Sequence, residues 1–134
     1  MSTNGARTRL LNFVCIEPFD RLWTKYGLTE NDMIGLENEI LVAPRKGDEI
    51  PGSGGFRKIR LSREGSSKGK SGSYRVLYLY VQAYATVFLV MVFGKNDKAD
   101  ISMADRNALA KRAGALKAWA KARHEEWLRR IQSQ

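Results

Sequence analysis

Residues 87–93 read VFLVMVF, and this unbroken apolar run limits the folds open to the chain more than any other feature. A strand with one face in water alternates apolar and polar side chains, so a continuous run predicts a central strand that is covered on both faces. The wider stretch AYATVFLVMVFG at residues 83–94 falls well short of the roughly 20 apolar residues that a membrane-spanning helix needs. We therefore expect a layered domain that does not associate with a membrane.

The 134 residues, 43% of them apolar, suit a single domain with one core. Hydrophobic periodicity and turn residues predict a strand at 12–17, helices at 18–27 and 29–42, strands at 56–62, 74–82 and 86–93, and a long helix from about residue 103. The second and third helices each begin at a capping pattern, TEND at 29–32 and SMAD at 102–105. Residues 44–55, PRKGDEIPGSGG, read as a polar loop. The order β-α-α-β-β-β-α predicts an α+β fold over residues 1–134, with a small antiparallel sheet, two N-terminal helices and an extended C-terminal helix.

Positive charge is concentrated in two parts of the chain. The net charge is +9, made up of −2 in residues 1–50, +7 in residues 51–98 and +4 in residues 99–134. A polyanion is the natural partner for such a distribution, because each phosphate that a protein neutralises releases condensed counterions. A basic surface that serves only solubility remains open.

Several common chemistries lack the residues that they need. With one cysteine, Cys15, and one histidine, His124, no zinc-like ligand set can be assembled, and no disulfide can form within the chain. The glycines of PGSGG and the GKS at residues 69–71 lack the strand–loop–helix context of a nucleotide-binding loop, so we expect no cofactor. We expect Cys15 to be a small buried thiol and His124 to be solvated or to cap its helix. The N-terminus shows no export signal, which agrees with a cytoplasmic protein.

The segment FRKIRLSREGSSKGKSGSYRVLYLY, residues 56–80, combines strand alternation with seven cations and one acid. Alternation places Lys58 and Arg60 on one sheet face and Arg57 on the other. Arg75 opens the next strand and Lys95 follows the last one. Together with Lys58 and Arg60, these two cations can converge on one phosphate. Metal-free RNA cleavage needs a base for the 2′-hydroxyl and positive charge at the phosphate. Lysine crowded by cations loses its proton more readily, and arginine clamps phosphate with two bonds. From the residues alone, catalysis, polyanion binding and a solvated face all stay open.

The chain resembles the RelE/ParE superfamily of toxins from bacterial type II toxin–antitoxin systems, and within it the HigB-like branch. The resemblance rests on IPGSGGFRKIR, GKSGSYRVLYLY and VFLVMVFGKND, followed by DIS and a helix, in that order over residues 12 to 115. It implies a small ribosome-dependent endoribonuclease that cuts mRNA without a metal. It also implies an antitoxin partner, which we expect to be of the helix-turn-helix type.

Carried over by position, the resemblance makes Lys58 the general base and Arg60, Arg75 and Lys95 the groups that stabilise the phosphate. It implies ribosome or RNA contacts for a second set: Arg57, Arg63, Lys68, Lys70 and Asn96. Two departures from the family pattern stand out. No tyrosine occurs at residues 98–102, so the proton donor is unassigned, and Asn96 replaces an arginine of some relatives. The tail after residue 115 is longer than expected, and its Trp119 and Trp127 suit either packing on the sheet or a partner surface.

Two other functions fit the same fold, since one fold serves several activities. One is inhibition of DNA gyrase, as in ParE-like relatives, without any nuclease chemistry. The other is nucleic-acid binding by an accessory protein that has lost toxicity. Lys58 and Arg75 favour the nuclease.

Overall fold

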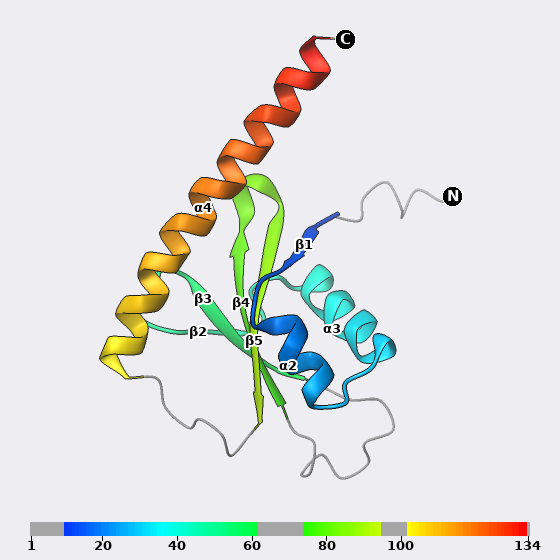
Figure 1. Ribbon diagram of the computed structural model, residues 1–134, viewed down its shortest axis with the longest axis vertical. Coiled ribbons are helices and arrows are strands. Elements are labelled where there is room, and N and C mark those ends of the chain that lie inside the picture. Colours follow the sequence, from blue (N-terminus) through cyan, green and yellow to red (C-terminus); the bar gives the residue numbers. More distant parts are fainter. Residues whose placement is uncertain (1–9, 62–73, 95–101, 134) are drawn as a thin grey trace.

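A five-stranded sheet with helices on both faces forms the body of the protein (Figure 1). The computed structural model describes residues 10–61, 74–94 and 102–133. Along the sheet the strand order is β1-β5-β4-β3-β2. The elements are β1 (Asn12–Cys15), α2 (Phe19–Lys25), α3 (Glu30–Val42), β2 (Asp48–Glu49), β3 (Phe56–Leu61), β4 (Tyr74–Val81), the 3-10 helix η1 (Gln82–Tyr84), β5 (Thr86–Gly94) and α4 (Met103–Gln132). The predicted α+β class is confirmed.

The helices α2 and α3 cover one face of the sheet. α3 begins at the predicted cap and ends at the predicted Val42, whereas α2 is shorter than the predicted helix at 18–27 and ends at Lys25. Thr29 Oγ1 accepts a hydrogen bond from the backbone N–H of Asp32 at 3.1 Å, and the Asp32 carboxylate accepts from the Thr29 N–H at 2.8 Å, so the predicted capping box forms. Their buried side chains pack with alternate residues of the strands in one cluster: Phe19, Trp23, Leu28, Leu36, Ile40, Ile59, Leu61, Val76, Tyr78, Val87, Leu89 and Val92.

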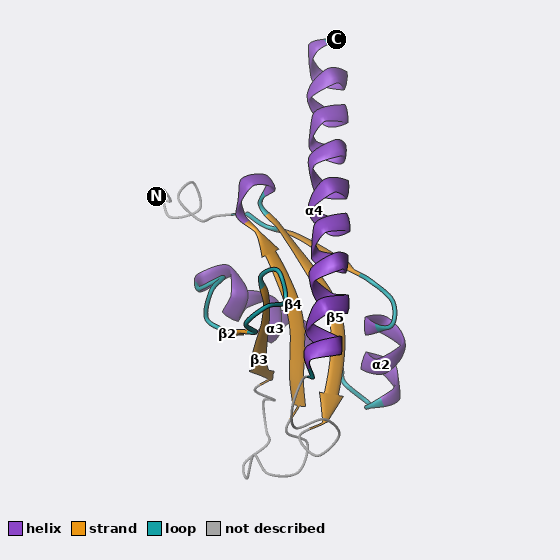
Figure 2. Ribbon diagram, turned by 90° about the vertical axis from the view of Figure 1, so that its left-hand side faces the viewer, coloured by secondary structure: helices purple, strands orange, loops and turns teal. Residues whose placement is uncertain are grey.

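The long helix α4 covers the other face and then runs past the body of the protein (Figures 1 and 2). It starts at the predicted cap, where Ser102 Oγ accepts from the Asp105 N–H at 3.1 Å. Ala113 and Ala120 are its buried residues, and they pack with a second cluster that includes Phe56, Leu79 and Phe88. At 1.5 Å per residue the 30-residue helix is about 45 Å long, which exceeds the sheet that it covers.

The central position of β5 is confirmed, but one of its neighbours runs in an unexpected direction. It pairs antiparallel with β4 and parallel with β1, in the register Asn12↔Thr86 to Cys15↔Leu89. The sheet is therefore antiparallel except at this edge. A parallel pair needs a long crossover, and α2, α3 and the β3–β4 hairpin together supply it.

Two local expectations were wrong. The polar segment after α3 is not only a loop, because it contributes the short edge strand β2. Ser53 in this segment is fully buried. Its Oγ donates a hydrogen bond to Ile50 O at 2.7 Å and accepts one from the Phe56 N–H at 3.0 Å. Cys15 is exposed rather than buried. Cys15 lies on the edge strand β1, so a neighbouring strand is present on only one side of it.

Candidate functional site

Two arginines face each other across the β3–β4 pair. Arg60 and Arg75 are Cα partners in the antiparallel register, and Arg75 is in turn the partner of Phe93 on β5. Side chains of directly opposite residues point to the same face and lie about 5 Å apart at Cβ. Opposed like charges destabilise a sheet, so this pair costs stability unless an anion neutralises it. Such a conflict with folding is typical of a functional site.

Lys58 adds a third cation on the same face, one pleat further along β3. It is the Cα partner of Leu77, which is two residues from Arg75. Lys58 also lies opposite Asp48 of β2, its other Cα partner. The buried Nη1 atom of Arg75 has no hydrogen-bond partner within the described part of the chain. The two rows Lys58–Leu77 and Arg60–Arg75 form what we call the cationic rows. This arrangement brings together three of the four residues that the sequence predicts to act on a phosphate.

A pocket of about 210 Å³ borders the cationic rows. Its floor contains Leu77 and Phe93, the sheet neighbours of Arg75, and its roof is the first part of α4. The lining residues are Leu77, Met91, Phe93, Asp105, Ala108, Leu109 and Arg112. Apart from Asp105 and Arg112 these residues are apolar, and they place the pocket beside Arg75, which itself does not line it.

Arg57 points to the opposite face, as alternation predicts, and there it supports the backbone. Its Nη1 donates to Arg45 O at 3.1 Å and to Gly47 O at 2.7 Å, and its Nη2 lies 3.8 Å from Glu49 Oε1. These bonds hold the segment between α3 and β2 against β3. The RNA contact expected of Arg57 stays a prediction, and the structure places its guanidinium away from the cationic rows.

The remaining predicted site residues lie outside the described residues. They are Arg63, Lys68, Lys70, Lys95 and Asn96. Lys95 directly follows Gly94, the Cα partner of Tyr74. Its role and those of the other four stay predictions.

Sequence reasoning missed the contribution of α4 to this face. Arg106, in the second turn of α4, has a buried Nε atom without a hydrogen-bond partner in the described chain, and its aliphatic stem lies near Gly52. Arg112 Nη2 donates to Glu17 O at 2.8 Å and ties the helix to the end of β1. The helical period from Ser102 indicates which side of α4 is apolar, but only the fold shows which strands that side covers.

In the described ranges 10–61, 74–94 and 102–133, no three His, Cys, Asp or Glu side chains lie close enough to hold a metal ion. The search over the same ranges finds no helix both long and apolar enough to span a bilayer.

The fold and the site define a class of protein: a basic α+β domain that has cations aligned on one sheet face and a helix across that face. Residues 19–132 match the family model described as the RelE toxin of the RelE/RelB toxin–antitoxin system. The chain belongs to this family of toxins.

Two solved structures from E. coli are similar to the chain. A mutant of the toxin RelE in the free state is 22% identical, with a TM-score of 0.49, and the alignment covers 76% of this chain and 95% of that one. A chain of the intact RelBE toxin–antitoxin complex is 24% identical, with a TM-score of 0.47, and the alignment covers 66% of this chain and all of that one.

Proposed function

We propose that this toxin is a ribosome-dependent endoribonuclease that cleaves mRNA by attack of a 2′-hydroxyl, without a metal ion, and so inhibits translation. The proposal includes membership of the HigB-like branch, a cytoplasmic location and a cognate antitoxin of the helix-turn-helix type. Membership of the RelE toxin family supports the toxin and its antitoxin partner. The chemistry rests on the residues of the cationic rows.

One observation carries the nuclease function: Arg60 and Arg75 are directly opposed on one face, with Lys58 one pleat away. A phosphate bound between the two guanidinium groups removes their mutual repulsion and accepts hydrogen bonds from both. Extra negative charge develops on that phosphate in the transition state, so the same contacts strengthen as the reaction proceeds.

In the proposed reaction, Lys58 takes the proton of the 2′-hydroxyl as the hydroxyl oxygen attacks the neighbouring phosphorus. The bond between phosphorus and the 5′-oxygen breaks, and that oxygen leaves with a proton. The products are a 2′,3′-cyclic phosphate and a 5′-hydroxyl. Arg60, Arg75 and Lys95 stabilise the phosphate, and the donor of the final proton is unassigned.

Recognition of the ribosome is proposed for residues away from the chemistry. Lys68 and Lys70, between β3 and β4, are cations that suit ribosomal RNA phosphates, because such contacts position a protein without reading sequence. Arg63 and Asn96 are assigned to the same surface. The ribosome supplies the register of the mRNA, so the toxin itself needs few base contacts.

Controlled induction of the gene followed by primer extension tests the proposal. New 5′ ends within translated regions are expected soon after induction, and none are expected with Lys58→Ala combined with Arg75→Ala. Growth arrest with intact transcripts contradicts the nuclease. In that case a supercoiling assay with purified gyrase distinguishes ParE-like inhibition, and unimpaired growth indicates an accessory protein without toxicity.

A further inference from the structure

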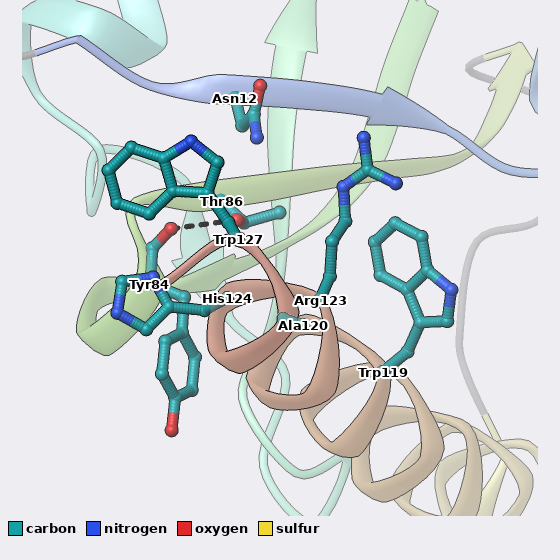
Figure 3. A pocket seen from close by; sticks show the side chains of 8 residues that line it. All are labelled: Asn12, Tyr84, Thr86, Trp119, Ala120, Arg123, His124 and Trp127. Atoms are coloured by element: carbon teal, nitrogen blue, oxygen red, sulfur yellow. Dashed lines mark hydrogen bonds between the residues drawn. The ribbon is translucent and has the colours of Figure 1, made fainter. Parts of the chain in front are cut away.

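A second pocket lies at the opposite end of β4 from the cationic rows. There η1 turns β4 into β5, and α4 passes over the turn with its residues 119–127 (Figure 3). The pocket has a volume of about 290 Å³ and is lined by Asn12, Tyr84, Thr86, Trp119, Ala120, Arg123, His124 and Trp127. We call it the tryptophan pocket. The eight residues of β4, at about 3.3 Å each, separate it from Arg75 by roughly 25 Å.

Ring contacts hold the aromatic walls of this pocket in place. The His124 ring lies between Tyr84, at a centroid distance of 5.2 Å, and Trp127, at 6.0 Å. Trp119 packs edge-on against Phe88 at 5.8 Å. His124 is thus neither fully solvated nor a helix cap, but part of an aromatic wall. Trp119 and Trp127 nevertheless remain 44% and 55% exposed, so about half of each side chain is accessible from outside.

Polar groups share the pocket with these rings. The Arg123 guanidinium lies over the Trp119 ring at 5.2 Å and, within the described residues, donates no hydrogen bond. Asn12 projects toward the same space from β1, whose backbone is fixed by a 2.8 Å bond from the Asn12 N–H to Ala85 O. An open indole face, a flat guanidinium and an amide together match a planar ligand with hydrogen-bonding edges.

The charge of α4 identifies the larger molecule that carries such a ligand. The helix contains eight Lys or Arg and three Asp or Glu, and one of these acids, Glu126, is already paired with Arg130 at 3.3 Å. Residues 117–130, the part of α4 around the tryptophan pocket, hold five Lys or Arg and two Glu, so this part of the helix is positive. Single-stranded nucleic acid is bound by this combination of stacking aromatic rings and backbone-tracking cations.

We propose that the tryptophan pocket binds an unstacked base of single-stranded RNA, as a second RNA-binding site distinct from the cationic rows. The base stacks on the open face of Trp127, and Arg123 contacts the adjacent phosphate or the base edge. Asn12 reads the base edge through its amide. This site anchors an RNA strand at the end of the sheet opposite the cleavage residues.

The test uses the full-length protein and a fluorescein-labelled dodecamer of mixed A and U whose sugars are 2′-O-methylated. Such RNA has no 2′-hydroxyl, so it cannot be cut, and binding is measured by fluorescence anisotropy whether or not the toxin is a nuclease. Trp127→Ala is expected to weaken binding about fivefold or more, since fivefold is the lower end of the loss found when a stacking aromatic is removed. Trp127→Phe retains most of the affinity because it keeps a stacking face.

Two matched controls separate the pocket from the rest of α4. Ile131→Ala removes an exposed apolar side chain one turn further along, and Arg129→Ala removes a cation outside the pocket. Ile131→Ala is expected to leave binding unchanged, and Arg123→Ala to weaken it more than Arg129→Ala does. Circular dichroism confirms that each variant is folded.

The proposal is overturned if Trp127→Ala binds the dodecamer as tightly as the unmodified protein. It is also overturned if the substitution acts only on self-association, measured by analytical ultracentrifugation, or only on antitoxin affinity. As a second measurement, 5-iodouridine in the same RNA should photocrosslink to Trp127 or Tyr84. Crosslinks confined to residues 56–61 contradict a separate site.

Discussion

Arg60 on β3 lies directly opposite Arg75 on β4, with both side chains on the sheet face that α4 covers. The backbone of this hairpin is well paired, so the two guanidinium groups are held together by the fold and not by attraction to each other. The sheet therefore holds two like charges side by side at the place where the proposed substrate phosphate binds.

Removal of one of these cations should stabilise the protein while abolishing its activity. Arg75→Leu is expected to raise the free energy of unfolding by about 0.5–1 kcal/mol, because it removes a buried Nη1 atom that has no hydrogen-bond partner in the described residues and adds an apolar side chain beside Phe93. Arg57→Leu is the matched control on the other face. It should lower the free energy of unfolding by about 1–3 kcal/mol, because the carbonyls of Arg45 and Gly47 lose their donor. Urea denaturation measures the free energy of unfolding of both variants. A lower free energy of unfolding in both contradicts the assignment of Arg75 to function and of Arg57 to stability.

Lys58 and Lys70 should differ in the step that they affect. Lys58→Ala is expected to reduce the cleavage rate on programmed ribosomes about 10²–10⁴-fold, as for loss of a general base, with ribosome binding nearly intact. Lys70→Ala should mainly weaken co-sedimentation with ribosomes. Lys58→Arg keeps the charge but cannot accept a proton at neutral pH, so it should be as inactive as Lys58→Ala. If both lysine-to-alanine variants lose binding and cleavage in parallel, this division of roles is wrong.

Docking of α4 should depend on the absence of a side chain at Gly54. This glycine has φ +83°, and a Cβ there would lie 2.8 Å from the Ala113 Cβ. Gly54→Ala therefore adds a clash to the cost of a left-handed conformation and should lower the free energy of unfolding by about 2–4 kcal/mol. Gly27→Ala has a similar φ, +70°, but open space around it, so it should cost only about 1 kcal/mol. Thermal unfolding of the two variants gives the comparison, and equal losses would argue against tight helix packing.

Cys15 should react slowly despite its exposure. Desolvation by burial of the sulfur, and then the nearby Asp20 carboxylate, raise the pKa of the Cys15 thiol from 9.0 to about 11. At pH 8 its alkylation by iodoacetamide should be about 100-fold slower than in urea, because the thiolate is the reactive form. Asp20→Asn should speed the reaction, and Glu37→Gln should have a smaller effect because its charge is the weakest contributor.

The raised pKa of the Cys15 thiol also predicts that the free energy of unfolding changes with pH. The raised pKa in the folded state means that the unfolded chain loses this proton first, near pH 9. The contribution of Cys15 to stability is thus complete below pH 9 and is lost as the pH rises through about 11. Cys15→Ala should flatten the pH dependence of the urea midpoint in this window. An unchanged slope would contradict a raised thiol pKa.

Local features of this fold can be predicted from the sequence, because they depend on neighbours within one turn or one pleat. The capping box of Thr29 and Asp32 and the facing of Lys58 and Arg60 are of this kind. The parallel pairing of β1 with β5 is not, because nothing within residues 12–17 identifies a partner so far along the chain. The exposure of Cys15 follows from that pairing and was missed for the same reason.

In the candidate site, too, some features can be predicted from the sequence and others cannot. Antiparallel hairpin pairing is enough to bring Arg75 opposite Arg60, since the two strands are consecutive. The tryptophan pocket instead needs Asn12, Tyr84 and Trp127, which come from an edge strand, a 3-10 turn and the far part of α4. Periodicity shows that Trp119 and Trp127 lie on similar sides of a helix, but it does not show which part of the sheet they meet.

The parallel pair of β1 and β5 also sets the order of events during synthesis. Asn12–Cys15 is among the first parts of the domain to be made, yet its hydrogen-bonding partner is Thr86–Leu89. The nascent chain must leave its first strand unpaired until the last strand has emerged from the exit tunnel, while the β3–β4 hairpin forms beforehand. A truncated product that ends before β5 therefore has an unprotected β4 edge and no closed sheet, so premature termination yields an aggregation-prone fragment instead of a smaller toxin.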